Sequence, residues 1–202
     1  MLDDMQIDFL ERHRGLKDTL SIIVFVIAVV IGAWLINLLL FRSFSVSGPS
    51  MESTLYTGDR LIVNRLPVTW AHIQGKAYEP KRGQVIVFKN PHFFQGMQDE
   101  YIVKRVIGLP GERVVLKDGK FTVFNNANPT GFNPDKLWTG PSSPTDGDVD
   151  RTVPQGEIFV SGDHRQEGYS LDSRNGLGTI PFEDIVGPVA LRIYPFTGIR
   201  TF

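Results

Sequence analysis

A chain of 202 residues is long enough for one substantial hydrophobic core, or for a main domain with a small satellite. Its 21 basic and 22 acidic side chains give a formal net charge of -1, so nucleic acid is not expected as a partner. The absence of cysteine excludes disulfide bonds, thiol catalysis and cysteine-based zinc sites.

The first predicted element is the uncharged apolar segment Leu20–Phe41. As an α-helix this segment spans roughly 33 Å, enough to cross a hydrocarbon core of about 30 Å. A buried core helix is usually shorter and has a polar face, and the apolar region of a cleaved signal peptide covers only about 7–15 residues. The length therefore predicts a retained transmembrane anchor over residues 20–41, with the lipid bilayer as a partner.

The charges that flank this segment predict its orientation. Basic residues are concentrated before it, at Arg12, Arg14 and Lys17, whereas Arg42 stands almost alone after it. Because basic residues stay preferentially on the cytoplasmic side, residues 1–19 are predicted to be cytoplasmic. The remainder of the chain, from residue 43, is then outside the membrane.

Short apolar runs separated by turn signals follow the anchor and predict a mainly β fold. The expected strands are 44–47, 60–65, 84–89, 101–107, 113–116, 120–124, 157–161 and 185–194. Asp118-Gly119 predicts a hairpin between two of them, and the Asn-, Pro- and Gly-rich stretch 125–150 is interpreted as one long loop. We therefore expect an antiparallel β domain built from 43–111 and 157–202, with a small hairpin-and-loop insertion at 112–156.

A Gly-Pro-Ser corner directly follows the first predicted strand. Pro49 has a fixed φ and no N–H, which stiffens the approach to Ser50, and Gly48 has no side chain to keep a substrate backbone away. Ser50 would then project from a rigid corner with its own N–H free to donate to an oxyanion. Taken alone, such a tripeptide is more often a simple turn.

The strand at 101–107 contains two adjacent cations, Lys104 and Arg105. Side chains alternate along a strand, so one of the two must face the core side. Arginine stays protonated in proteins, so only Lys104 is a candidate base. Apolar neighbours would bring its pKa from about 10.4 to about 7–8 at a cost of roughly 4 kcal/mol. The alternative is a surface lysine paired with Glu100 or Glu112.

These two features belong to a longer series of motifs that covers most of the chain outside the insertion. The motifs are Ser50–Leu55, Gly58-Asp59 with Val63, Lys81–Phe88, Tyr101–Glu112, and Gly162–Arg165 with Ser170–Arg174. In this order, behind one membrane anchor, they resemble the motifs of bacterial type I signal peptidases, the Ser/Lys peptidases that remove signal peptides from exported proteins. The resemblance implies a signal-peptidase-like β fold in the bacterial cell membrane and signal peptides as the substrates.

The resemblance also implies roles for individual residues. Ser50 is the expected nucleophile, Lys104 the general base, and Ser170 the residue that hydrogen-bonds and orients the lysine amine. The backbone N–H of Ser50 is the expected oxyanion donor, whereas Gly48 stands where some members supply a serine hydroxyl, so a second donor is open. Asp172 and Arg174 are expected to form a structural ion pair near the site.

Substrate is expected to add as a strand between the segments 44–47 and 101–103. The predicted substrate-binding residues are Phe44, Val46, Met51, Leu55, Tyr101, Ile102 and Val103. Their shallow apolar pockets would accept only small side chains, such as Ala, at the residues one and three before the cut. No cofactor is expected, and the four scattered histidines predict no metal site.

Three departures from the family pattern leave alternatives open. Ser53 replaces a usual proline, His164 replaces a common asparagine, and residues 166–169 make the last motif longer than usual. One alternative is catalysis by Ser50, His164 and Asp163 in a Ser-His-Asp manner, although Asp163 and His164 are sequence neighbours. Another is a tethered β domain without enzymatic activity that binds a partner through the loop 125–150.

Overall fold

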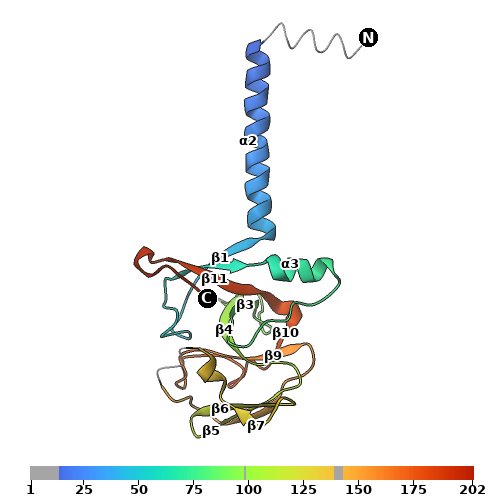
Figure 1. The fold of residues 1–202 in the computed structure, drawn as a ribbon. Coiled ribbons are helices and arrows are strands. Elements are labelled where there is room, and N and C mark those ends of the chain that lie inside the picture. The colour runs from blue at the N-terminus through green and yellow to red at the C-terminus, as the bar shows by residue number, and fades with distance from the viewer. Residues whose placement is uncertain (1–13, 98, 139–142) are drawn as a thin grey trace. The chain divides into compact units, whose positions relative to one another are not determined.

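The computed structural model describes residues 14–97, 99–138 and 143–202. Two compact units divide the chain, Met1–Leu40 and Phe41–Phe202 (Figure 1). In the first unit, helix α2 covers Arg14–Leu39. Within the described part of the chain, α2 is the one helix long and apolar enough to cross a membrane, over Gly15–Ile36.

The helix differs from the predicted anchor at both ends. It begins six residues earlier than Leu20, because Lys17 and Asp18 continue the helical backbone before the apolar run starts. At the other end Phe41 is already the first residue of strand β1. Of the predicted cytoplasmic segment 1–19, residues 1–13 lie outside the described residues.

The second unit is built on an eight-stranded sheet. Its order is β1-β2-β11-β3-β4-β9-β10, with β12 paired to β11, and every pair is antiparallel. The strands are β1 (Phe41–Ser45), β2 (Arg60–Asn64), β3 (Val85–Lys89), β4 (Tyr101–Gly108), β9 (Glu157–Ser161), β10 (Ile180–Pro181), β11 (Ile185–Tyr194) and β12 (Arg200–Thr201). The prediction of a mainly antiparallel β fold is confirmed.

Strand β11 joins the two halves of this sheet. Its first part pairs with β3, at Ile185↔Phe88, and its later part pairs with β2, at Val189↔Val63. At the change of partner, Gly187 has φ +155, and a Cβ there would lie 2.4 Å from the carbonyl oxygen of Asn64. Glycine is therefore required where β11 leaves one half and enters the other.

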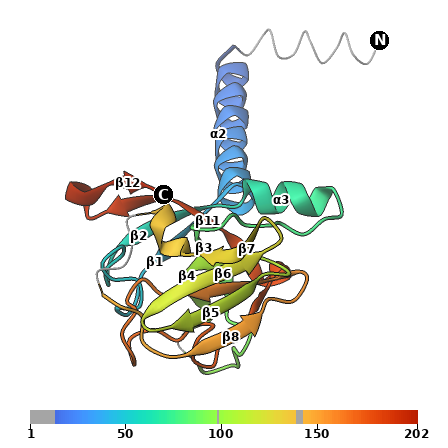
Figure 2. The ribbon, with the colours of Figure 1, turned by 60° about the horizontal axis from the view of Figure 1, so that its bottom comes forward.

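The insertion forms a second, four-stranded sheet with the order β7-β6-β5-β8. Figure 2 shows these strands side by side: β5 (Arg113–Lys117), β6 (Lys120–Asn125), β7 (Asn128–Phe132) and β8 (Val149–Thr152). The predicted hairpin at Asp118-Gly119 is confirmed, since Lys117 pairs with Lys120. The expectation of one continuous loop over 125–150 is wrong, because this stretch contains β7 and the 3-10 helix η1 (Pro134–Leu137).

The described residues of the second unit also form three short helices. These are α3 (Leu66–Ile73), η2 (Phe182–Asp184) and η3 (Phe196–Gly198). Val68 is the buried residue of α3, and it packs in the same apolar cluster as Ile86 and Phe88 of β3. A second cluster combines Met51 and Leu55 with residues of β2, β3 and β11, and it supports the loop that follows β1.

Candidate active site

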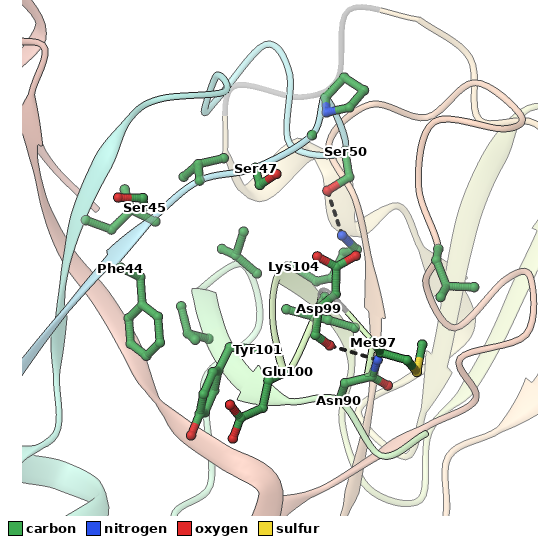
Figure 3. Close-up of a pocket in the computed structure, with 18 of the residues that line it drawn as sticks. Phe44, Ser45, Ser47, Ser50, Asn90, Met97, Asp99, Glu100, Tyr101 and Lys104 are labelled. Atoms are coloured by element: carbon green, nitrogen blue, oxygen red, sulfur yellow. Dashed lines mark hydrogen bonds between the residues drawn. The ribbon is translucent and has the colours of Figure 1, made fainter. Parts of the chain in front are cut away.

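A cleft of about 500 Å³ lies between the loop after β1 and strand β4. Figure 3 shows Phe44 and Tyr101 at one end of it and Ser50 with Lys104 at the other. Residues from five parts of the chain line it: Phe44, Ser45, Val46, Ser47, Gly48, Pro49, Ser50, Leu61, Val87, Asn90, Met97, Asp99, Glu100, Tyr101, Ile102, Val103, Lys104, Tyr169 and Leu171.

The loop that carries Ser50 is fixed at both ends and from below. The N–H of Val46 donates to the carbonyl of Asp59, and the N–H of Gly58 donates to the carbonyl of Val46. Within the loop, the N–H of Leu55 donates to the carbonyl of Met51, and both of these side chains are fully buried. Apolar burial therefore holds the turn, and Ser50 is placed directly before a buried residue.

Lys104 comes from the opposite side of the cleft and reaches this serine. Its Nζ lies 2.7 Å from Oγ of Ser50, and only 3% of the lysine is exposed. Arg105 turns to the other face, as alternation in a strand requires. There it forms a buried ion pair with both carboxylate oxygens of Asp163, at 2.8 and 2.6 Å. Of the two neighbouring basic residues, Arg105 therefore has a carboxylate partner, whereas Lys104 faces a hydroxyl.

The electrostatics of the site favour a neutral amine at Lys104. Burial lowers the pKa of Lys104 to about 8, because an ammonium loses its hydration there. The negative charges of Asp172, Asp99 and Asp163 oppose this change, and Arg174 adds to it. Near neutral to mildly alkaline pH the amine is therefore partly unprotonated, as a proton acceptor must be.

A hydrogen-bond network from the last motif lies behind the serine and lysine. Ser170 is buried and its Oγ donates to Asp172 at 2.7 Å, so in this structure its side-chain bond is to the carboxylate. Asp172 also pairs with Arg174 at 2.8 Å, with exposed side-chain fractions of 0% and 4%. Burial raises the pKa of Asp172, but the hydrogen bonds and charge of Arg174, with the N–H of Gly162 and the hydroxyl of Ser170, outweigh it and lower that pKa. This ion pair is buried, so it differs from a solvent-exposed pair worth little.

Gly162 brings this network into contact with the serine loop. A Cβ at this position would lie 2.3 Å from Oγ of Ser170 and 2.3 Å from the carbonyl oxygen of Ser50. Two parts of the site therefore pack directly against the bare Cα of one residue. Ser170 therefore lies beside the serine loop, but among the described residues its hydroxyl bonds Asp172 and the amine of Lys104 bonds Ser50. The predicted hydrogen bond from Ser170 to the lysine amine is not present in this structure, and an orienting role for Ser170 stays a prediction.

The alternative Ser-His-Asp arrangement is not assembled in the structure. Asp163 uses both carboxylate oxygens on Arg105. The ring of His164 has Nδ1 3.2 Å from the carbonyl oxygen of Pro49 and Nε2 3.4 Å from Oε1 of Gln166. Neither ring nitrogen is bonded to the hydroxyl of Ser50, whose hydrogen-bond partner is Lys104.

The predicted substrate-binding residues divide into two groups. Phe44, Val46, Tyr101, Ile102 and Val103 line the cleft. Met51 and Leu55 do not line it, because their side chains point into the apolar core beneath the serine loop. These two residues of the serine motif support the loop from below. The sequence pattern alone does not distinguish such a residue from one that lines a pocket.

Several cleft residues were outside the prediction. Asp99, Glu100 and Met97 enter the cleft from the segment before β4, and Tyr169 and Leu171 enter from the last motif. The signal for the last two was their position on both sides of Ser170. Tyr169 and Leu171 are exposed and line the cleft, whereas Ser170 between them is buried and turns its hydroxyl toward Asp172.

A serine hydroxyl against a buried, partly unprotonated amine is the arrangement of serine hydrolases that use lysine in place of histidine. The profile of the family "Signal peptidase, peptidase S26" matches residues 16–194. Signal peptidase I P of Bacillus subtilis subsp. natto is 31% identical over 199 residues, which cover 95% of this chain and 98% of the relative. Signal peptidase I T of Bacillus subtilis (strain 168) is 36% identical over 184 residues, covering 87% and 84%.

Among solved structures, a signal peptidase I from Enterococcus faecalis V583 is 28% identical, with a TM-score of 0.41, and the match covers 56% of this chain and 98% of that one. From the family profile and the relatives, the chain belongs to the signal peptidase family, peptidase S26. It is a serine endopeptidase that removes signal peptides from exported precursor proteins. The predicted resemblance is confirmed.

Proposed function

We propose that this signal peptidase is membrane-bound and cleaves precursors with Ser50 as nucleophile and Lys104 as general base, through an acyl-enzyme. The observation that carries the proposal is the 2.7 Å contact between Nζ of Lys104 and Oγ of Ser50 at a buried amine. A general base must be within hydrogen-bond reach of the proton that it takes, and its pKa should lie near the working pH. Both conditions hold for Lys104.

The two half-reactions follow from this contact. The neutral amine of Lys104 takes the hydroxyl proton as Oγ of Ser50 attacks the scissile carbonyl. The resulting ammonium then gives that proton to the leaving amine of the mature protein, and the signal peptide stays as an ester on Ser50. In the second half the amine takes a proton from water, whose oxygen attacks the ester. The proton returns to Oγ, and the signal peptide leaves with a new carboxylate.

The backbone N–H of Ser50 is the proposed oxyanion donor. Within the described part of the chain, no backbone carbonyl or side chain accepts a hydrogen bond from it. The carbonyl of Ser50 is fixed by the N–H of His164 at 3.1 Å, which sets the plane of the serine backbone. Gly48 lines the cleft with φ +84, and a second donor from this position stays a prediction.

The substrate strand is proposed to lie between β1 with its continuation and β4. Strand β1 is at the end of the sheet order, so one edge has no strand partner among the described residues. In β4, the partners from β9 begin only at Arg105, which leaves one edge of Tyr101–Lys104 open in the described structure. An added strand between them satisfies both sets of backbone groups. Val46, Ile102 and Val103 would then limit the residues before the cut to small side chains.

The anchor explains where the reaction takes place. Helix α2 is proposed to cross a bacterial cell membrane, with the N-terminus in the cytoplasm and residues 43–202 outside. An exported precursor presents its cleavage site at the outer end of its own apolar segment. A domain tethered to the same surface meets that site without a long diffusional search.

The test uses the full chain in detergent micelles and a purified precursor, with sequencing of the new N-terminus. We expect Lys104→Ala and Ser50→Ala to lower the cleavage rate by more than about a thousandfold, because they remove the base or the nucleophile. Lys117→Ala changes an exposed lysine of the insertion and should cleave like the parent. Near-normal turnover by Lys104→Ala would refute the Ser/Lys mechanism.

A further inference from the structure

Tyr169 stacks on His164 at the edge of the active-site cleft. The two ring centroids are 4.1 Å apart and the ring planes differ by 6°. Tyr169 is 49% exposed and lines the cleft, as does Leu171, which is 51% exposed. One face of the tyrosine is therefore covered by the histidine, and much of the rest is available to a bound chain.

His164 connects this ring to the serine loop. Its N–H donates to the carbonyl of Ser50 at 3.1 Å, and its Nδ1 lies 3.2 Å from the carbonyl oxygen of Pro49. The histidine therefore contacts the backbone of the proposed nucleophile and of the proline before it, and the tyrosine is stacked on this histidine.

The segment that carries Tyr169 is fixed on both sides. The N–H of Glu167 donates to the carboxylate of Asp146 at 3.0 Å. After Tyr169, the side-chain amide of Asn175 donates to the carbonyl of Ser170 at 2.7 Å. Because the backbone is held before and after the ring, the stack has a rigid base rather than a free loop.

The position of Tyr169 relative to a substrate follows from the direction of the cleft. Phe44 and Tyr101 mark one end, with ring centroids 5.3 Å apart, and Ser50 with Lys104 marks the other (Figure 3). Under the proposed function, the residues before the cut occupy the space between these two ends. The chain after the cut must continue past Ser50. Tyr169 lines the cleft next to this point, because it stacks on His164, whose N–H bonds the carbonyl of Ser50, and Leu171 lines the same cleft two residues further along the chain.

We propose that Tyr169 is a specificity-determining residue which, with Leu171, contacts the first residues of the mature protein after the cut. His164 is a positioning residue that braces the ring. The exposed surface of this pair is a phenol ring and an isobutyl group, so it favours uncharged apolar side chains over small polar ones. This inference rests on the proposed function, because it uses the direction in which the signal peptide lies.

The experiment compares two purified precursors that differ only in the first two residues after the cut, Leu-Leu in one and Ser-Ser in the other. The readout is the ratio of their kcat/KM values with the full chain in detergent micelles. We expect the parent enzyme to prefer the Leu-Leu precursor and Tyr169→Ala to lower that ratio by about tenfold, the size of an apolar contact of this kind. Tyr169→Phe should keep the ratio, because the ring and its stack remain.

Two comparisons separate contact from general damage. Tyr194→Ala removes another tyrosine of 49% exposure that is paired with an aromatic ring, Phe196, outside the cleft lining, and it should leave the ratio unchanged. His164→Ala should lower the ratio like Tyr169→Ala, and the double variant should lower it no further, since both changes remove one braced wall. A general loss of rate in His164→Ala cancels in the ratio.

The outcomes distinguish this inference from the proposed function. If Tyr169→Ala cuts both precursors with the parent's ratio, or loses rate equally on both, the specificity role is overturned. That result leaves the Ser/Lys assignment untouched, provided that Ser50→Ala and Lys104→Ala are inactive. Additive losses in the double variant would overturn the bracing role of His164.

Discussion

Two influences of opposite sign act on the pKa of Lys104. One is burial of the amine, and the other is the negative charge of nearby carboxylates. Burial lowers its pKa to about 8, while Asp172, Asp99 and Asp163 hold that pKa up. Asp172 and Asp163 are themselves neutralised by ion pairs with Arg174 and Arg105. Asp99 is exposed in the cleft. Of the three carboxylates, it is therefore the one that can be removed with the least disturbance of the packing and hydrogen bonds around Lys104.

We therefore predict a pH profile that is set by Lys104 and adjusted by Asp99. Since the unprotonated amine is the active form, kcat/KM should rise with pH through about 8 and level off above it. Asp99→Asn removes a negative charge that favours the ammonium, so the rising limb should move to lower pH. The measurement is kcat/KM against pH with one precursor.

The matched control for this profile is Glu100→Gln. Glu100 is also exposed and also lines the cleft, but it is not among the charges that shift the pKa of Lys104. Its profile should overlay that of the parent. A rising limb near pH 6.5 in the parent would contradict the lysine assignment, because that is where an unperturbed histidine titrates.

Among individual residues, those whose chemistry permits only one role could be predicted from the sequence. Lys104 was predicted because only one of two adjacent cations can lose its proton, and the structure places it against Ser50. Met51 was predicted as a pocket residue but is buried, since an apolar residue beside a nucleophile suits either place. The stack of Tyr169 on His164 was not predictable, because it depends on the path of a loop.

At the scale of elements, the strands that were predicted well are those with strong apolar patterns. The runs 157–161 and 185–194 match β9 and β11 at both ends. Helix α3 was missed because it is short and contains Pro67, Val68 and Thr69, residues of low helix propensity. Strand β7 was missed because Pro129 and Gly131 are rare inside strands, and it forms the end of its sheet, where such residues are tolerated.

The insertion has a structural connection to the active site through Arg165. This arginine is fully buried, and both terminal nitrogens bind Asp135 of η1, at 2.9 and 2.7 Å. The same residue donates to the carbonyl of Gly162 at 2.8 Å, next to the serine loop. The insertion therefore supplies the carboxylate that neutralises a cation within the last motif.

We predict that Asp135→Ala lowers the free energy of unfolding by about 3 kcal/mol, because it leaves a buried guanidinium without its counter-charge. Activity should fall as well, since the backbone of residues 162–165 contacts Ser50. The measurement is urea unfolding in detergent micelles, with the slope against urea compared between variants.

A second aspartate of the insertion provides the control for this prediction. Asp150 also pairs with an arginine, Arg113, through two hydrogen bonds, but both side chains are more than half exposed. Asp150→Ala should therefore change stability and activity little. Equal effects of the two substitutions would show that the buried pair has no special role.

For the whole molecule, the two units have sequence properties that suit two different solvents. The described apolar side chains of α2 are largely exposed within the structure, which is unfavourable in water and favourable in lipid. Among its described residues, the second unit has three buried apolar clusters, and many of its charged side chains are exposed. The length and lack of charge of the apolar run were enough to predict a long apolar helix, whereas the proposed orientation depends on a few basic residues.

The absence of cysteine makes the orientation directly testable. Each single substitution to cysteine gives a protein with one thiol and no background. We choose Asp4→Cys, in the predicted cytoplasmic segment, and Asp148→Cys, an exposed position of the insertion. In intact bacterial cells, a membrane-impermeant maleimide should label Asp148→Cys and leave Asp4→Cys unlabelled. After the membrane is opened, both should react, which controls for the reactivity of each thiol.

The opposite labelling pattern would have a consequence for the function as a whole. With residues 43–202 in the cytoplasm, Ser50 would be on the side from which precursors depart, and the cut site at the outer end of their apolar segment would be out of reach. We expect labelling outside because Arg12, Arg14 and Lys17 outweigh Arg42 in the bias toward the cytoplasm. Replacing those three residues with Gln should therefore reduce the labelling of Asp148→Cys in intact cells, and precursor processing in the same cells should fall with it.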